Sequence, residues 1–451
     1  MENPTAGKSG SVSALDSADR RGILPTVKIL PSLLLVLLPM DARAIPNSVF
    51  GPVAAADSPL NGRDLTGELM AAPVWNGHAD LPGKWQPEGN VASAEMSHLL
   101  ARPKLFGCDV VLLRAAKRDG RLQFLEATFA DAGSYFGYYD EKPAEKSDRR
   151  ALREEIQRKT AERQAEFSRL YESTLDSLKT QLADDGKPKV ETIGRSRVLR
   201  AETTDYQNDG RTVRLWADGK RLIRATIYQN QEPPDSWLDE KIEEIPAKAR
   251  AQRLKEFVNQ STDGTVSITG LQPLPQGYRP YCGLNSLAMV ARHFGLYLDE
   301  DGLAVAGAFQ NTGSADGSKI LSLYPAVASE AGFGLDRANR FDENTVRRAL
   351  AAGFPVIVWR RFSQERNDLH TRFVREFTKT PQATLPDPSL AAERASWPGS
   401  DAPLHASVIT GFHDTRREFL FLESWSGRDT PRRMRVEEMA ATAYLTFVFH
   451  P

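Results

Sequence analysis

The sequence is poor in the residues that build metal centres and disulfide frameworks. Its 451 residues include only two cysteines, Cys108 and Cys282, and seven histidines. Two cysteines cannot form a disulfide framework, and pairing them would leave no thiol for chemistry, so we expect both to be free. No group of histidines and cysteines has metal-ligand spacing, and no His-Glu-x-x-His segment occurs. We therefore expect neither a metal ion nor any other cofactor.

An excess of charge of either sign is also absent. The chain has 58 Lys and Arg against 59 Asp and Glu, for a net charge of −1, so nucleic acid is not an expected partner. No G-x-x-x-x-G-K-[ST] segment occurs, which excludes a P-loop ATPase. What is present is a hydrophobic content of 41% in a chain long enough for two or three domains.

Long hydrophobic runs are missing too. The apolar run over residues 29–40 has 12 residues, whereas a membrane-spanning helix needs about 20. The run is followed by Ala42-Arg-Ala44, the small-residue spacing of a cleavage site. We predict a signal peptide over residues 1–44, export to the periplasm or the extracellular space, and no stable membrane insertion after cleavage. The alternatives are an uncleaved membrane anchor formed by residues 29–40 and a short buried helix.

The region before Cys282 divides into two parts. Residues 45–89 are rich in Pro, Gly, Ala and Asp and lack periodicity, which predicts a poorly ordered leader. Residues 90–265 are expected to form a small α+β domain, in which the patterns predict strands near 108–114, 122–129, 196–201, 212–217 and 222–228, a turn at 117–120 and a charged helix over 147–183. This domain contains no recognisable chemistry. It is a substrate-binding module, a packing partner or an inhibitory segment.

Cys282 stands at the start of a segment with helical periodicity. It occurs in Gln276-Gly-Tyr-Arg-Pro-Tyr-Cys282-Gly, and the apolar residues that follow at spacings near three and four are Leu284, Leu287, Ala288, Ala291 and Phe294. The N-terminus of a helix carries partial positive charge and free N–H groups, which lower the pKa of a thiol. A thiolate attacks carbonyl groups far better than a thiol does. Cys108, by contrast, lies on an apolar strand and is expected to be a core residue.

Three further residues complete an acyl-transfer site of this kind. His405, before a hydrophobic strand, would take the thiol proton and later protonate the leaving group. Glu423, in Glu423-Ser-Trp, would accept a hydrogen bond from the other imidazole nitrogen. Gln276 would donate its side-chain amide to the developing oxyanion, beside the backbone N–H of Cys282. Of the remaining histidines, His370 lies in a charged helical stretch and is interpreted as solvated.

These motifs resemble the papain-like cysteine peptidases, and more narrowly the C39-like peptidase domain related to bacteriocin-processing enzymes. The resemblance rests on Gln-x5-Cys-Gly, the later His405 and the Glu423-Ser-Trp element, and it covers roughly Pro273 to Phe449. Papain-like sites usually have Asn or Asp where this chain has Glu423. The family's bacteriocin exporters also carry an ATPase, which this chain lacks, so a double-glycine leader substrate is not implied.

The resemblance implies a fold and an activity. We expect an α+β protein whose C-terminal domain, residues 266–451, is papain-like, with the cysteine-bearing helix packed on an antiparallel sheet. Its implied activity is hydrolysis of peptide bonds in a peptide or protein substrate. The alternatives are an acyltransferase or transglutaminase-like enzyme that uses the same residues with an amine acceptor, and a catalytically silent papain-like binding module. Trp359 and Trp397 are candidates for shaping the pocket.

Overall fold

The structure is a computed structural model that describes residues 57–91, 94–136, 149–183, 187–194, 199–208, 210–229, 245–274, 276, 279–307, 317–380, 382–424 and 430–451. The predicted signal peptide, residues 1–44, lies outside these ranges. All of the described residues belong to one unit, Ala42–Pro451. In this described part of the chain, no helix combines the length and the apolar character needed to cross a bilayer.

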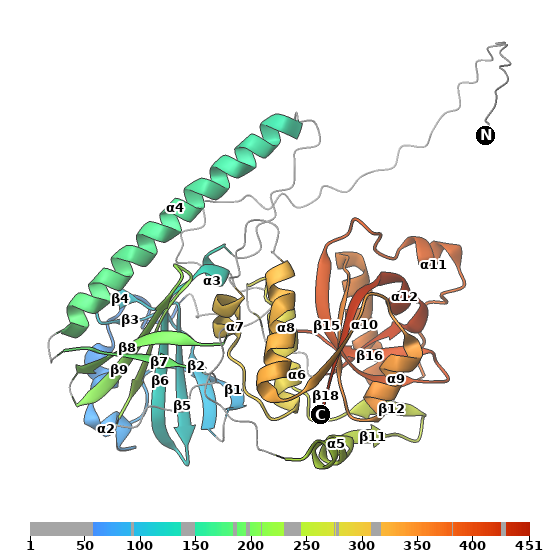
Figure 1. The fold of residues 1–451 in the computed structure, drawn as a ribbon, viewed down its shortest axis with the longest axis horizontal. Helices are drawn as coiled ribbons and strands as arrows, with labels where there is room; N and C mark the ends of the chain where they lie inside the picture. Colours follow the sequence, from blue (N-terminus) through green and yellow to red (C-terminus); the bar gives the residue numbers. More distant parts are fainter. Residues whose placement is uncertain are drawn as a thin grey trace, which may run out of the picture. The chain divides into compact units, whose positions relative to one another are not determined.

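The described residues before position 230 form an antiparallel sheet (Figure 1). Its eight strands, in spatial order, are β1 (Trp85–Val91), β2 (Ala94–Leu99), β5 (Leu112–Arg118), β6 (Arg121–Asp131), β10 (Leu222–Tyr228), β9 (Arg211–Asp218), β8 (Ala201–Asn208) and β7 (Lys189–Ile193). We call it the N-terminal sheet. A separate short pair is formed by β3 (Lys104–Leu105) and β4 (Cys108–Asp109).

Tight turns set the register of this sheet. Arg118 pairs with Arg121, so Asp119 and Gly120 form a two-residue loop, and both have positive φ, 51° and 75°. Two such residues match the right-handed twist of the flanking strands, which is why Asp-Gly favours this hairpin. The predicted hairpin at residues 117–120 is therefore present. Of the strand expected over residues 196–201, residues 196–198 lie outside the described ranges, and Ala201 begins β8. The side chains of β7 are largely exposed, and it lacks the apolar pattern that identifies a strand.

Residues 57–89, expected to belong to a poorly ordered leader, instead fold against the N-terminal sheet. They form α1 (Thr66–Met70), α2 (Ala72–Trp75) and the start of β1. Trp75 is buried in the same hydrophobic cluster as Leu69 and Leu125, and its indole Nε1 donates to the Leu69 carbonyl at 2.7 Å. The expectation failed because these apolar residues follow no long period. Each of them instead packs individually into the hydrophobic cluster that covers the N-terminal sheet.

Two more helices accompany this sheet. One is the short α3 (Ala132–Phe136), and the other is the predicted charged helix, α4 (Arg149–Leu182). Phe167, Tyr171, Leu178 and Leu182 of α4 are buried in the cluster that also contains Leu125 of β6. The helix thus packs one face on the sheet and leaves its charged face in solvent, as its periodicity predicted.

The C-terminal residues form a second antiparallel sheet, which we call the C-terminal sheet. Its strands run in the order β11 (Val258–Gln260), β12 (Thr265–Ile268), β15 (Leu404–His413), β14 (Val356–Arg361), β18 (Ala443–His450) and β13 (Gly334–Ala338), and β15 also pairs with β16 (Glu418–Leu422), which pairs with β17 (Arg432–Arg435). Because β11 and β12 belong to this sheet, the boundary lies before Val258 and not at residue 266 as expected.

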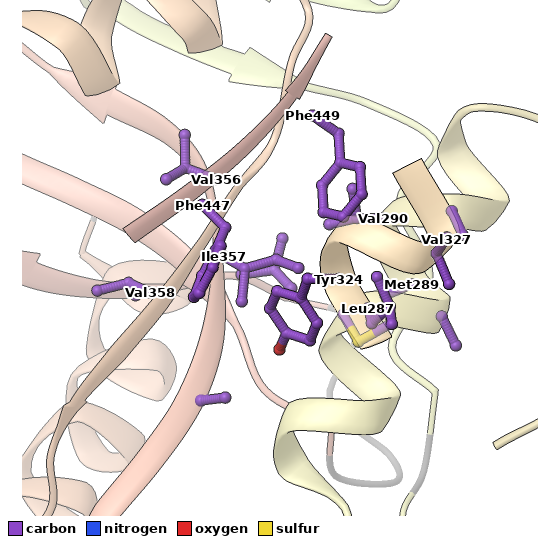
Figure 2. Packing of buried hydrophobic residues seen from close by; sticks show 14 of the residues in the cluster. Leu287, Met289, Val290, Tyr324, Val327, Val356, Ile357, Val358, Phe447 and Phe449 are labelled. Atoms are coloured by element: carbon purple, nitrogen blue, oxygen red, sulfur yellow. The ribbon is translucent and has the colours of Figure 1, made fainter. Parts of the chain in front are cut away.

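Helices accompany this sheet, and most of them contribute side chains to one hydrophobic core. They are α5 (Ala247–Lys255), α6 (Cys282–His293), α7 (Glu300–Ala306), α8 (Gly317–Ala331), α9 (Glu343–Ala351), α10 (Gln364–Lys379), α11 (Ala391–Ala395) and α12 (Val436–Thr442). Leu287 of α6, Tyr324 of α8, Ile357 of β14 and Phe447 of β18 meet in this core (Figure 2). The expectation of an α+β protein is confirmed.

Candidate active site

Cys282 is the first residue of α6. The helix is buried on nearly all sides because it contacts β14 and β15 as well as α7 and α8. The predicted face of Leu284, Leu287 and Ala288 is fully buried. The helix begins after Tyr281 with no side chain capping its first turn. The N–H groups of that turn have no partner within the helix, so they present positive potential where the thiol lies.

The structure brings His405 and Glu423 together with Cys282. His405 lies on β15, and its side chain hydrogen-bonds the Cys282 thiol. Its Nε2 atom is 2.6 Å from Oε2 of Glu423, which directly follows β16. Since Nε2 engages the carboxylate, Nδ1 is the ring nitrogen left for the thiol. The three residues form a continuous hydrogen-bonded chain from thiol to carboxylate, in which Glu423 is 2% exposed.

Two residues that the sequence did not single out hold Glu423 in place. The Arg360 guanidinium donates from Nη2 to Oε1 of Glu423 at 2.7 Å. The Ser407 hydroxyl donates to Oε2 of Glu423 at 2.9 Å, and Arg360 Nε donates to Ser407 Oγ at 3.2 Å. A buried carboxylate requires such partners. Both carboxylate oxygens are therefore fixed, and the carboxylate in turn fixes the orientation of the His405 ring.

The strand register explains why these residues meet. Arg360 on β14 pairs directly with His405 on β15. Residues opposite each other in an antiparallel pair point to the same face, and so do positions two apart on one strand, such as His405 and Ser407. The sequence feature that could have identified Arg360 as a site residue is a charged residue near the end of the otherwise apolar β14. Ser407 could have been identified from its position two residues after His405, on the same face of the strand.

The electrostatics of the chain favour an ion pair between sulfur and imidazole. Burial would lower the pKa of His405, but the charges of Glu423 and Cys282 outweigh it and raise the pKa to about 9. Burial would raise the pKa of the Cys282 thiol, but His405 and the backbone N–H of Ala406 stabilise the thiolate and lower it. Burial would likewise raise the pKa of Glu423, but His405 and Arg360 bring it to about 2. Each group is stabilised in its charged form by its neighbour.

Gln276 is fully buried beside these residues. Its backbone N–H donates to the Ser424 carbonyl at 2.9 Å, and its side-chain oxygen accepts a hydrogen bond from the Ser424 hydroxyl. Its side-chain Nε2 donates to the Arg279 carbonyl at 2.7 Å. Gln276 thus ties the residue after Glu423 to the loop that precedes Cys282.

The start of α6 is also held from the side of the sheet. The Tyr324 hydroxyl donates to the Gly283 carbonyl at 2.8 Å and accepts a hydrogen bond from Trp359 Nε1 at 3.2 Å. A Cβ atom on Gly283 would lie only 2.4 Å from the Trp359 ring. The Cys-Gly pair is therefore needed so that Trp359 can pack against the helix start. Trp397, the other tryptophan expected to shape a pocket, instead donates to Glu393 at 3.2 Å.

The remaining candidate residues lie elsewhere. Cys108 is buried on β4, and both cysteines are free. His370, interpreted as solvated, is instead 1% exposed and contacts Glu438 at 3.3 Å, because its face of α10 turns inward. Trp425 lies outside the described residues. Among the described His, Cys, Asp and Glu side chains, no group of three has the arrangement of a metal site.

Comparison with known proteins places this arrangement in a family. Residues 256–449, less than half of the chain, match the model of the Peptidase_C39 like family. This region is a C39-like peptidase family domain. The resemblance to the C39-like peptidase domain noted from the sequence is confirmed, and the matched region begins at residue 256, before the expected Pro273. No curated protein matches the chain.

The C39-like domain contains all four predicted site residues. Cys282, His405, Glu423 and Gln276 lie within the matched range, and so do Arg360 and Ser407. The N-terminal sheet lies outside it. The residues predicted from the sequence to form the site therefore all belong to the C39-like domain.

Proposed function

We propose that the protein is a cysteine peptidase that hydrolyses peptide bonds at Cys282. The observation that carries the proposal is the hydrogen-bonded chain of Cys282, His405 and Glu423 at the N-terminus of α6. The lowered pKa of the thiol and the raised pKa of His405 support a thiolate–imidazolium pair at neutral pH. This pairing is the chemistry that a thiol nucleophile requires.

The proposed reaction has two steps. The Cys282 thiolate attacks the substrate carbonyl carbon, and the imidazolium of His405 protonates the leaving amine as the C–N bond breaks. The product is a thioester on Cys282 and a neutral imidazole. A water molecule, deprotonated by that imidazole, then attacks the thioester, releases the carboxylic acid and restores the ion pair. Glu423 stays ionised and orients His405.

Two donors are proposed for the oxyanion of the tetrahedral intermediate. One is the backbone N–H of Cys282, whose position in the first turn of α6 supports the role. The other is the side-chain amide of Gln276, which is buried and bonded to the Arg279 carbonyl in the segment before Cys282. The contact between Gln276 and Ser424 supports this assignment because it keeps the amide near Glu423. A papain-like arrangement of the domain is part of this proposal, supported by the cysteine-bearing α6 packed on β14 and β15.

The test separates hydrolysis from its alternatives. The Cys108→Ser protein, which keeps a single thiol, is incubated with a peptide mixture, with and without an added primary amine, and products are identified by mass spectrometry. We expect free carboxyl termini at defined bonds and none with Cys108→Ser/Cys282→Ser. Amide products formed in preference to acids would make the protein an acyltransferase. No product, together with an unreactive Cys282, would make it a silent binding module.

Export is a separate proposal that rests on residues 1–44. The apolar run 29–40 and Ala42-Arg-Ala44 support a cleaved signal peptide. The intact mass of protein recovered from a bacterial periplasm or culture medium should correspond to a new N-terminus near Ile45. Full-length protein retained in the cytosol would contradict cleavage and export.

A further inference from the structure

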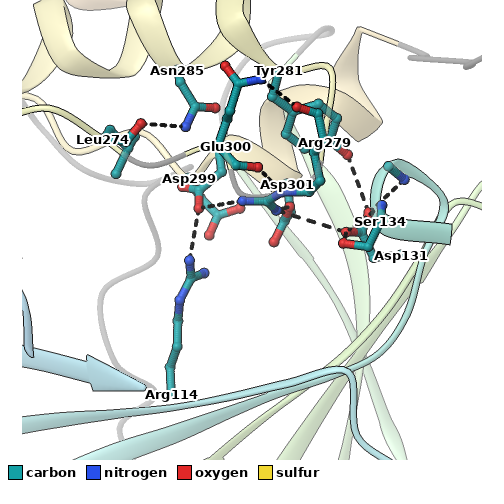
Figure 3. Close-up of polar contacts among 12 residues, drawn as sticks. Arg114, Asp131, Ser134, Leu274, Arg279, Tyr281, Asn285, Asp299, Glu300 and Asp301 are labelled. Carbon is teal, nitrogen blue, oxygen red and sulfur yellow. Dashed lines mark hydrogen bonds and ion pairs between the residues drawn. The ribbon is translucent and has the colours of Figure 1, made fainter. Parts of the chain in front are cut away.

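A buried ionic network joins the N-terminal sheet to the C39-like domain (Figure 3). Arg224 of β10 donates from Nη1 to Asp299 and from Nη2 to Asp301, both at 2.9 Å. Asp299 caps α7 by accepting from the Gly302 N–H at 2.6 Å. Arg224 is 3% exposed, so these ion pairs are sheltered from solvent. One arginine of the N-terminal sheet therefore holds the start of a helix that packs on α6.

The network continues to the loop before the nucleophile. Arg279 pairs with Asp301 through Nη1 and with Glu300 through Nη2. The Arg279 Nε atom donates to the Gln276 carbonyl at 3.0 Å. Arg114 of β5 reaches the same Glu300 at 2.8 Å. Arg279 thus pairs with the same two acids, Glu300 and Asp301, that arginines of the N-terminal sheet contact. Arg279 in turn donates to Gln276.

A second contact reaches the residue next to Cys282. The hydroxyl of Tyr281 donates to Oδ1 of Asp131, at the end of β6, at 3.3 Å. The Arg279 guanidinium stacks 4.8 Å from the centre of the Tyr281 ring. Asp131 is itself fixed by the backbone N–H groups of Gly133 and Ser134.

The approach of Tyr281 depends on a glycine of the N-terminal region. A Cβ atom on Gly133 would lie 2.1 Å from the Tyr281 hydroxyl, so any larger residue there would displace the ring. The absence of a side chain at position 133 and the presence of Asp131 thus serve the same contact. Asp131 is the last residue of β6, and Gly133 lies in α3, which directly follows it.

We propose that the N-terminal sheet is a positioning element of the active site, in which Arg224 and Asp131 fix residues 279–281 and thereby place Cys282 and Gln276. The proposal rests on the proposed peptidase function. It assigns a role to a region in which the sequence shows no chemistry. Arg224 and Asp131 are positioning residues, since they act through Arg279 and Tyr281 and touch neither the thiol nor His405.

The contacts distinguish this role from inhibition. An inhibitory segment occupies the nucleophile and is released on activation. The contacts of the N-terminal sheet described here instead reach residues 279–281, which directly precede Cys282, through buried side chains. Removing one partner of a buried ion pair leaves an uncompensated charge, so separation of the two parts would disorder the loop and not activate it.

A matched pair of arginine substitutions tests the proposal. Arg224 and Arg214 lie on neighbouring strands and are 3% and 7% exposed; Arg224 pairs with Asp299, Asp301 and Glu126. Among the described residues, Arg214 pairs only within the N-terminal sheet, with Asp205 at 2.8 Å and with Glu191. Arg224→Gln and Arg214→Gln are made in the Cys108→Ser protein. Two quantities are measured. One is the rate at which iodoacetamide alkylates Cys282 as a function of pH, and the other is kcat for peptide hydrolysis.

Arg224→Gln should lower kcat by about 10- to 100-fold, the size expected for misplaced reacting groups, and move the midpoint of the alkylation profile to higher pH. Arg214→Gln should leave both quantities within about twofold, whatever its effect on stability. Equal losses in the two variants, or wild-type values in Arg224→Gln, would overturn the proposal. An unreactive Cys282 in the parent protein would instead overturn the proposed function, and this inference with it.

Tyr281→Phe decides the matter if Arg224→Gln does not fold. This substitution removes only the hydroxyl that donates a hydrogen bond to Asp131, and it keeps the aromatic ring that stacks on Arg279. We expect a decrease in kcat of about three- to tenfold, and the double variant with Asp131→Asn should lose little more, because the two residues share one contact. Additive losses, or an unchanged kcat and alkylation profile in Tyr281→Phe, would show that the contact does not position Cys282.

Discussion

Each region of the protein contains one cysteine, and their surroundings shift the thiol pKa in opposite directions. Cys108 lies beside the N-terminal sheet, where burial raises its pKa above the usual value. Cys282 is also sheltered, but His405 and the Ala406 N–H stabilise its thiolate and lower its pKa. Burial alone therefore makes a cysteine inert. A cationic partner and a helix start make one reactive.

The buried arginines extend the comparison. Arg214 pairs within the N-terminal sheet and has a structural role there. Arg360 pairs with Glu423 inside the C39-like domain, where it supports the proposed chemistry. Arg224 belongs to the first region but pairs with acids of the second. Arg224 therefore links the two regions, whereas Arg214 and Arg360 each pair within their own region.

The largest expected effect comes from the nucleophile. Cys282→Ser should fold normally, because the substitution is small, and should lose peptidase activity by at least about a thousandfold, since a hydroxyl lacks the nucleophilicity of a thiolate. Peptide cleavage rates and thermal unfolding are measured together. Cleavage near the parent rate by purified Cys282→Ser would remove this cysteine from the mechanism.

The next effect concerns Glu423, the position at which this chain departs from the usual Asn or Asp. Glu423→Gln should lower activity by about 10- to 100-fold, because the amide still accepts from His405 but stabilises the imidazolium less. Glu423→Ala should lower it further. It also leaves Arg360 buried without its carboxylate, which should cost about 3–5 kcal/mol in the free energy of unfolding. Wild-type activity in Glu423→Ala would place the orienting group elsewhere.

The pH dependence of activity should reflect the His405 pKa. Since that pKa is raised to about 9, the imidazolium persists at neutral pH and is lost as the pH rises through 9, so kcat/KM should fall on an alkaline limb near that value. Glu423→Gln removes the negative charge that raises the pKa of His405, so its limb should lie at lower pH. Identical limbs in the two proteins would contradict the coupling between His405 and Glu423.

The smallest expected effect belongs to the other cysteine. Cys108→Ser should leave activity within about twofold, because Cys108 contacts none of the residues assigned to the site. Because Cys108 is buried, the substitution should lower the free energy of unfolding by about 1 kcal/mol, which urea unfolding would detect. A large loss of activity without a matching loss of stability would show that the two cysteines are not as different as their surroundings indicate.

The parts of the site that the sequence predicted are those with local or family patterns. Cys282, His405, Glu423 and Gln276 were identified from short motifs, and the hairpin at Asp119-Gly120 from its turn residues. Arg360 and Ser407 were missed as site residues because their role depends on the register of β14 against β15. That register follows from the packing of the whole sheet.

The contacts between the regions were out of reach for a similar reason. Arg224 and Asp299 are 75 residues apart in the chain, and neither belongs to a motif. Gly133 gave no signal, since its role appears only when the Tyr281 ring is placed against it. The leader over residues 57–89 was misjudged because isolated apolar residues such as Trp75 pack without a period. Pairing across regions is fixed by tertiary structure and leaves little trace in local sequence.

Competition between the two cysteines for one electrophile tests whether Cys282 is the activated thiol. The unmodified protein is treated with limiting iodoacetamide at pH 6 to 8, and each cysteine is quantified by peptide mass spectrometry alongside residual peptidase activity. Cys282 should be alkylated first, at least about tenfold faster than Cys108 and with activity lost in proportion, because its surroundings lower its pKa whereas burial raises that of Cys108. Equal labelling of both cysteines, or full activity after Cys282 is alkylated, would contradict the role of Cys282 as the activated nucleophile.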